Sequence, residues 1–108
     1  MEYQSTRSDC LTASSTAAVL QGLAPDGGLY MRKDFGGFDW RSVLKLDTLD
    51  MAERILSYLL PDFQNMGALV RRAYEGKFET PDLTPLTPVG GRYVLELFRG
   101  PTSAFKDV

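Results

Sequence analysis

Lys106 is the ionisable residue best placed to act as a catalytic amine. It follows an apolar stretch at 93–98, a turn at Gly100–Pro101 and the first residues of a helix-compatible segment, and it stands between Phe105 and Asp107. Ligands of open α/β sheets bind beyond the carboxyl ends of the strands, so a lysine at this place can project into a cleft. A partly apolar pocket disfavours the ammonium form, and the neutral amine can form a Schiff base. The alternative is a solvated surface lysine, the commoner role of a lysine near a helix start.

Other nucleophilic and metal-binding chemistry finds little support in the 108 residues. The chain contains no histidine, which excludes a Ser-His-Asp triad, a Cys-His dyad and a histidine-ligated zinc site within it. Cys10 is the only cysteine, so no internal disulfide can form and no oxidising compartment is needed. The acidic residues show no metal-ligand spacing. We therefore expect a small structural or surface cysteine and no metal.

Charge and glycine spacing argue against nucleic-acid and nucleotide binding. The 12 Lys and Arg residues are balanced by 14 Asp and Glu residues, a net charge of −2, whereas nucleic-acid binding needs a basic surface. The glycine pairs at 27–28, 36–37 and 90–91 match neither a dinucleotide fingerprint nor a phosphate loop. These pairs predict turns.

Composition favours a globular, soluble protein. Hydrophobic residues make up 44% of the chain, which is ordinary for a folded domain. The N-terminus lacks the apolar core of a signal peptide, and no apolar run approaches the ~20 residues that span a bilayer. We expect a cytoplasmic protein with no membrane partner.

Apolar spacing and capping residues predict three helices, over 12–21, 48–60 and 65–75. The second has Ala52, Ile55, Leu56 and Leu59 at helical spacing, with Asp47 or Thr48 as its cap. Short extended pieces are expected near 3–6 and 28–31. The aromatic loop residues Phe35, Phe38 and Trp40 are expected to pack against the paired helices, because otherwise they would expose a large apolar patch.

The C-terminal fifth of the chain predicts a change of structure. Three prolines within 80–88 indicate an extended linker, and 93–98 is the strongest strand pattern. Apolar residues on both faces of that strand favour a strand covered on both sides, as in parallel α/β sheets. We place a domain boundary between 88 and 89. Because domains seldom end one turn into a helix, we expect the protein to continue beyond Val108; the alternative is a frayed C-terminal tail.

Three blocks of sequence resemble threonine synthases of the longer, bacterial and fungal subgroup. The blocks are Tyr3–Arg7, Gly22–Tyr30 and Leu95–Val108, the last reading LELFRGPTSAFKDV. Their order and separation match the family, and the second and third together are specific. One departure is Arg99, where the family usually has histidine, so no family role is carried over to that position.

The resemblance implies an α+β, helix-rich N-terminal domain that leads into the first strand and helix start of a fold type II pyridoxal-phosphate domain. It implies an enzyme that converts O-phospho-L-homoserine and water to L-threonine and phosphate. By motif position, Lys106 would bind pyridoxal 5'-phosphate and then act as a base on the substrate. The rest of the catalytic domain would be the partner of this segment.

Two further residues and two further functions remain open. Thr102 and Ser103 could offer hydroxyls and backbone N–H groups to a substrate phosphate, or they could cap the helix. A threonine synthase-like phospho-lyase would use the same lysine but release a keto acid. A non-catalytic interaction domain of the same ancestry is the alternative from another class. The 108-residue segment alone is expected to be inactive.

Overall fold

The protein is described here by a computed structural model that covers residues 2–108. Three helices and five short strands follow one another, with short 3₁₀ turns at Trp40–Val43 and Phe105–Asp107. The order is β1 (Glu2–Ser5), β2 (Thr12–Ser14), α1 (Ser15–Gln21), β3 (Tyr30–Arg32), α2 (Thr48–Leu59), α3 (Met66–Tyr74), β4 (Leu86–Val89) and β5 (Arg92–Leu95). All strand pairs are antiparallel and separate from the helix pair, so the predicted α+β class is confirmed.

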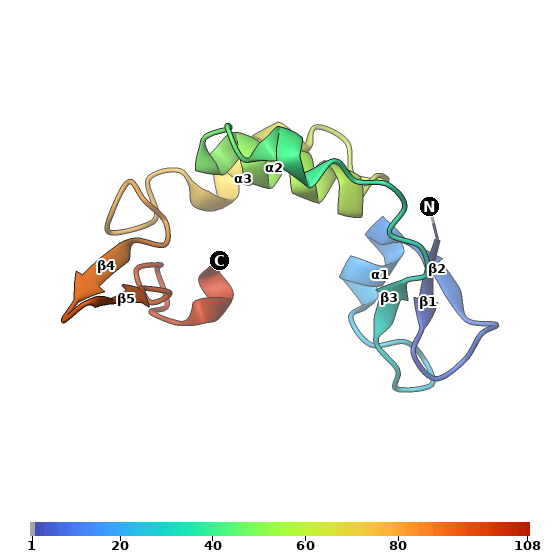
Figure 1. Cartoon of the computed structure of the whole chain (residues 1–108). Coiled ribbons are helices and arrows are strands. Elements are labelled where there is room, and N and C mark those ends of the chain that lie inside the picture. The colour runs from blue at the N-terminus through green and yellow to red at the C-terminus, as the bar shows by residue number, and fades with distance from the viewer. Residues whose placement is uncertain (1) are drawn as a thin grey trace.

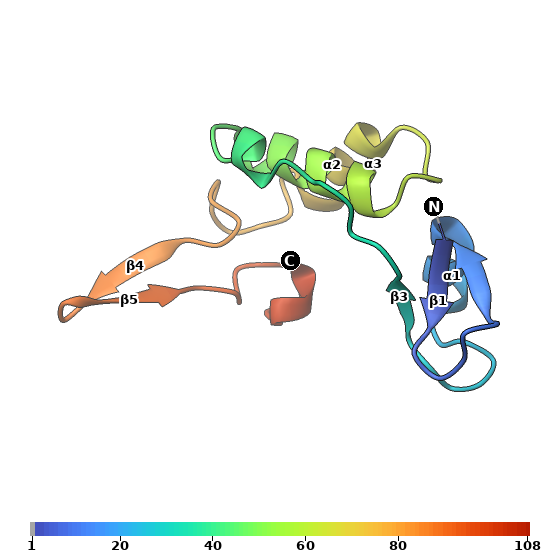
Figure 2. The same ribbon diagram turned by 45° about the vertical axis from the view of Figure 1, so that its right-hand side comes forward.

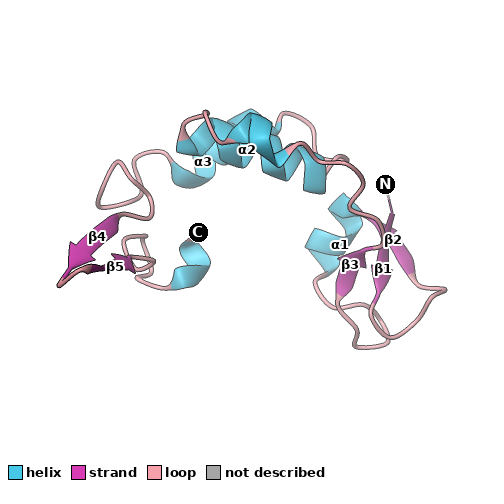
Figure 3. Cartoon of the chain, viewed as in Figure 1, coloured by secondary structure: helices cyan, strands magenta, loops and turns pink. Residues whose placement is uncertain are grey.

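The elements form an arch (Figures 1 and 2). A sheet with α1 stands at one end, α2 and α3 lie across the middle, and the β4–β5 hairpin stands at the other end. Figure 3 shows that long loops join these three parts. The dimensions are 50 × 28 × 27 Å. Each part therefore has its own small set of packing contacts.

The N-terminal sheet has the order β2-β1-β3 and is stabilised by polar turn contacts. Asp26 accepts hydrogen bonds from the Ser5 hydroxyl at 2.8 Å and from the Gly28 N–H at 2.9 Å. The Gly28 hydrogen bond is the main reason that the pKa of Asp26 lies below its usual value. A side chain at Gly28 would collide with Ser5 Oγ, so this turn requires glycine. The expected extended piece near 28–31 is present as β3, and β1 covers the one near 3–6.

Helices α2 and α3 form the centre of the arch. Asp47 caps α2 by accepting hydrogen bonds from the N–H groups of Leu49 and Asp50, both at 3.0 Å. Val70 of α3 is only 2% exposed and is the largest fully buried side chain in the described residues. The predicted bounds of these two helices are correct to within one residue at each end.

Side chains of the N-terminal sheet cover the C-terminal end of α2. The Tyr3 hydroxyl donates to the Leu59 carbonyl at 2.6 Å, and the Arg32 guanidinium donates to the Tyr58 carbonyl at 3.0 Å. These carbonyls lack partners within the helix, and a cation is favourable at this end of its dipole. Nearby, Asp62 accepts from the Ser15 N–H at 2.8 Å and from the Ser15 hydroxyl at 2.7 Å. Polar contacts thus join the first two parts of the arch.

Two local expectations are wrong. The first helix begins at Ser15 rather than at 12, because residues 12–14 pair with β1 as β2. The aromatic loop does not form a buried cluster: Phe35 is 56% and Trp40 is 51% exposed. Phe38 packs on the helix pair, with its ring 4.6 Å from that of Tyr58. The Trp40 ring instead contacts the Arg41 guanidinium on its own turn.

The strand expected at 93–98 is also different. It covers Arg92–Leu95 and pairs antiparallel with Leu86–Val89, inside the stretch expected to be a linker. All four residues of β5 are exposed in the described chain, so any cover on its two faces would come from other sequence and stays a prediction. Pro88 is tolerated because β4 is an edge strand. The boundary between 88 and 89 falls within β4 and stays a prediction.

Candidate functional site

The segment that follows β5 is held to the rest of the chain by a charged network. Glu96 is 9% exposed and accepts hydrogen bonds from the Thr87 hydroxyl at 2.8 Å and from Arg99 Nε at 2.6 Å. Arg99 also contacts Glu79 Oε2 at 2.9 Å, and its carbonyl accepts the Glu79 N–H at 3.0 Å. Arg99 is the main reason that the pKa of Glu96 is lowered, and Glu96 the main reason that the pKa of Arg99 is raised.

This network gives Arg99 a structural role that the sequence alone did not reveal. The resemblance left the role of this position in doubt. Here its side chain joins the segment before β4, through Glu79, to the segment after β5, through Glu96. A signal was present in the sequence, since Glu96 is the one charged residue in the apolar run 93–98. A buried carboxylate needs a partner.

After Gly100 the chain folds back on itself in a compact loop, residues 100–108. Asp107 accepts hydrogen bonds from the Thr102 N–H at 2.8 Å and from the Thr102 hydroxyl at 2.6 Å. The Ser103 N–H donates to the Gly100 carbonyl at 3.1 Å, and Ser103 has a φ of 57°, which is uncommon for a residue with a side chain. The helix start that the pattern predicts is present only as the 3₁₀ turn Phe105–Asp107.

The predicted site residues Lys106, Thr102 and Ser103 therefore share one loop. Lys106 is exposed on the 3₁₀ turn, and within residues 2–108 it makes no hydrogen bond or ion pair. Ser103 is exposed as well, and its hydroxyl makes no hydrogen bond to the described residues. The Thr102 hydroxyl and N–H are both occupied by Asp107.

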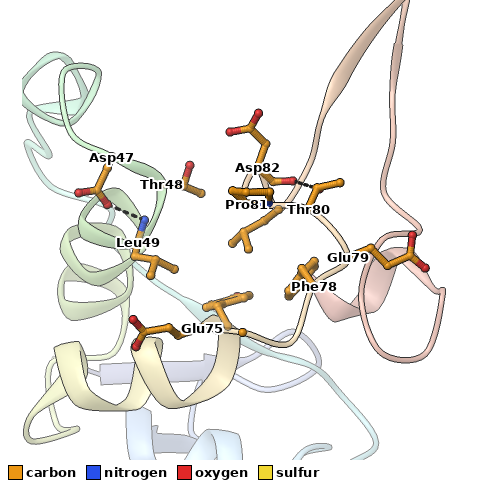
Figure 4. A pocket seen from close by; sticks show the side chains of 12 residues that line it. Asp47, Thr48, Leu49, Glu75, Phe78, Glu79, Thr80, Pro81 and Asp82 are labelled. Atoms are coloured by element: carbon orange, nitrogen blue, oxygen red, sulfur yellow. Dashed lines mark hydrogen bonds between the residues drawn. The ribbon is translucent and has the colours of Figure 1, made fainter.

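Two cavities of the described chain lie away from Lys106. The larger, about 560 Å³, opens between the start of α2 and the segment 74–83 (Figure 4). Its lining includes the carboxylates of Asp47, Glu75, Glu79 and Asp82. An apolar groove of about 260 Å³ runs along α2 and reaches Val108. Lys106 lines neither, so these residues alone do not enclose its amine.

Two chemical possibilities find no support in residues 2–108. These residues contain no group of three or more His, Cys, Asp or Glu side chains that could hold a metal ion. Their helices are also too short or too polar to cross a bilayer.

Comparison with known proteins identifies the family. The family model described as threonine synthase N terminus matches residues 2–88. The threonine synthase of Corynebacterium glutamicum is 36% identical and is aligned over 100% of this chain and 25% of its own length. That of Schizosaccharomyces pombe is 37% identical, over 100% of this chain and 22% of its own.

A solved structure agrees with the sequence matches. The crystal structure of threonine synthase from yeast superimposes with a TM-score of 0.81 at 35% identity, over 98% of this chain and 23% of that one. The chain thus spans about a quarter of the length of these relatives. Because the matches cover the whole fold, the resemblance read from the three sequence blocks is confirmed, and the chain belongs to the threonine synthase family as its N-terminal domain.

Proposed function

We propose that this chain is the N-terminal part of a pyridoxal-phosphate-dependent threonine synthase of fold type II. The longer protein converts O-phospho-L-homoserine and water to L-threonine and phosphate, with carbon–oxygen lyase chemistry. The observation that carries the proposal is Lys106: it stands in the family's lysine motif, on a folded loop, with its amine free of protein partners within residues 2–108. The relatives are about four times longer, so the activity belongs to the longer protein.

The residues present fit the cofactor at one point, its covalent attachment. Lys106 offers an exposed primary amine on a loop held by its own hydrogen bonds. Pyridoxal phosphate, when bound, supplies an electron sink for negative charge that develops on the substrate. Lys106 would hold the cofactor and, once released, would move protons at the α and β carbons of the substrate as a general base. The glycine pairs of this chain form turns, so the phosphate-binding glycines would come from other sequence.

Ser103 and Thr102 belong to the proposal as weaker candidates for the substrate phosphate. The Ser103 hydroxyl makes no hydrogen bond to the described residues, which leaves it open to an anion. Thr102 already uses both of its donors on Asp107. The alternative capping role is wrong for both residues, because the N-cap of the 3₁₀ turn is Ala104 and no side chain caps it.

The proposal extends to the surroundings of the domain. Its partner is the rest of the catalytic domain, with the domain boundary between 88 and 89. We propose a cytoplasmic protein, in which the exposed Cys10 would stay reduced. The phospho-lyase alternative differs in its product, a keto acid instead of threonine. The non-catalytic alternative differs in forming no product at all.

The test uses the longer protein with pyridoxal phosphate, borohydride reduction and peptide mapping. We expect saturable labelling at Lys106, with threonine and phosphate as the products. Lys106→Ala should abolish both the labelling and the turnover. Lys45→Ala changes an exposed lysine elsewhere and should leave labelling and turnover intact. Labelling at another lysine would overturn the assignment of Lys106, and keto-acid release would favour the phospho-lyase.

The 108-residue chain alone is expected to give neither selective labelling nor turnover. Water would readily hydrolyse a covalent link between an aldehyde and an exposed lysine, and Lys106 lines neither of the two cavities described above. Saturable labelling of Lys106 over the other lysines in this short chain would contradict that expectation.

A further inference from the structure

We propose that Asp107 is a positioning residue for Lys106: by holding Thr102 with both carboxylate oxygens, it fixes the loop from which the lysine projects. The inference rests on the proposed function of Lys106 and deepens it. It assigns a positioning role to Asp107, the residue next to the lysine.

The first argument is the closure of the loop. Asp107 Oδ2 accepts the Thr102 N–H at 2.8 Å, and Asp107 Oδ1 accepts the Thr102 hydroxyl at 2.6 Å. Lys106 lies between these two residues in the sequence. Two hydrogen bonds across five residues leave the backbone at Lys106 little freedom, whereas a single bond would allow rotation about it.

The second argument is that the backbone conformation of residues 100–107 allows Asp107 to reach Thr102. A Cβ at Gly100 would lie 2.5 Å from the Cβ of Asp107, so only glycine lets the carboxylate approach. Ser103 has a positive φ of 57°, and its N–H donates to the Gly100 carbonyl. The Asp107 N–H donates to the Ala104 carbonyl at 3.0 Å. An uncommon conformation persists where its surroundings impose it.

The third argument concerns charge. Hydrogen bonds from the Thr102 hydroxyl and then its N–H hold the pKa of Asp107 below its usual value, so the side chain is an ionised acceptor near neutral pH. Its oxygens face Thr102, and no ion pair joins Asp107 to Lys106 in the described residues. The lysine amine is therefore left free for a ligand, although its neighbour is an aspartate.

Positioning matters because a reacting group displaced by about 1 Å can lose on the order of a hundredfold in rate. A loop closed by Asp107 would hold the backbone at Lys106, from which the amine projects, in place before the cofactor arrives. We therefore expect the formation of the covalent link, and not only turnover, to depend on this carboxylate.

The experiment measures covalent attachment in the longer protein. Borohydride-trapped pyridoxal phosphate at Lys106 is quantified by peptide mass over a cofactor titration, beside the thermal midpoint of each cofactor-free variant. Asp107→Asn removes the charge and replaces one of the two acceptor oxygens with an amide N–H₂, so one Thr102 donor loses its acceptor. Trapping at limiting cofactor should fall by on the order of tenfold. Thr102→Val removes only the hydroxyl and should give a smaller loss, while Thr102→Ser should restore it.

The control is Asp82→Asn, which changes an exposed carboxylate that makes no hydrogen bond within residues 2–108. It should trap cofactor like the parent protein. Losses in Asp107→Asn and Thr102→Val with unchanged thermal midpoints, together with rescue by Thr102→Ser, would support positioning.

Two results would overturn the inference alone: parent-like trapping in Asp107→Asn and Thr102→Val, or losses that merely follow a fall in thermal midpoint. Failure of the parent protein to trap cofactor at Lys106 would overturn the proposed function, and the inference with it.

Discussion

At the scale of single residues, the contact between Ser15 and Asp62 gives a stability that depends on pH. Ser15 is completely buried and donates both its hydroxyl and its N–H to Asp62. The Ser15 hydroxyl is the main reason that the pKa of Asp62 lies below its ordinary value of 3.8. A carboxyl whose pKa is lower in the folded than in the unfolded chain stabilises the fold fully above the ordinary value. That stabilisation is lost as pH falls through the lowered one.

We therefore expect Asp62→Asn to lower the urea midpoint at pH 7, and the gap from the parent chain to close as pH falls well below 3.8. Urea denaturation of both chains across pH 2 to 7 measures this. A gap of constant size over that range would show that the charge of Asp62 contributes nothing.

Arg99 offers a second test at the same scale. Its hydrogen bond is the first cause of the lowered pKa of Glu96, and Thr87 is the second. In Arg99→Leu the pKa of Glu96 should rise toward its ordinary value while Thr87 keeps it from rising fully. Carboxyl-detected NMR titration of Glu96 follows the change. Arg92→Leu, an exposed arginine of the same hairpin, serves as the control and should leave the titration unmoved.

At the scale of elements, what the sequence could predict follows from whether the determining contacts are local. The cap at Asp47 and the stripe from Ala52 to Leu59 lie within one helix, and the bounds of α2 were predicted almost correctly. Strand β2 was missed because it is extended through its pairing with β1, whose residues lie eight or more positions away in the sequence. Strand β4 was missed for a different reason. Its partner β5 is the next strand of a local hairpin, but Pro81, Pro85 and Pro88 suggested a linker, and an edge strand accepts Pro88.

The candidate site divides in the same way. Lys106 was identified from a linear motif, which needs no tertiary information. The bond between Asp107 and Thr102 and the network of Glu79, Glu96 and Arg99 depend on how the backbone turns, and no spacing rule predicts either of them. Likewise, the burial expected for Trp40 depends on where its loop lies, and the ring is half exposed.

Helix α3 allows a matched comparison of two neighbouring residues. Val70 is 2% exposed and Leu69 is 41% exposed. Val70→Ala removes two buried methyl groups from a packed site and should cost about 2 kcal/mol of unfolding free energy. Leu69→Ala removes a larger group but should cost less than half as much, because much of that group already contacts water. Denaturant unfolding of the two variants measures the difference, and equal costs would contradict the burial of this face.

The junction of the N-terminal sheet with α2 gives another prediction. Tyr3→Phe removes only the hydroxyl that donates to the Leu59 carbonyl at 2.6 Å. Loss of one such hydrogen bond should lower the unfolding free energy by about 1 kcal/mol. Hydrogen exchange should also speed up in the last turn of α2, which loses its capping donor, and not in α3. Unchanged exchange in the last turn of α2 would mean that the carbonyl needs no cap from the sheet.

At the scale of the whole molecule, the arch is too open for a chain of this length. Its radius of gyration is 16.4 Å, whereas a compact domain of similar size would have about 13 Å. The stripe of α2 is only half buried and lines an open apolar groove. Large apolar side chains are exposed along the hairpin, including Leu86 at 59% and Tyr93 at 70%. Contiguous apolar surface of this kind marks interaction sites.

The last prediction follows from that openness and from the proposal that the rest of a catalytic domain covers this one. Leu95 of β5 is 54% exposed in the described chain. In the 108-residue chain, Leu95→Lys should change the unfolding free energy by no more than about 0.5 kcal/mol, as surface substitutions usually do.

In the longer protein the same substitution would force a charged amine against apolar partners, and the loss should be several times larger. Arg92→Ala, on the same strand, is the control and should behave alike in both chains. Denaturant unfolding of both lengths decides the matter. Equal effects of Leu95→Lys in the two chains would mean that the hairpin stays in water, and the covering surface would then have to be sought along the apolar groove of α2 instead.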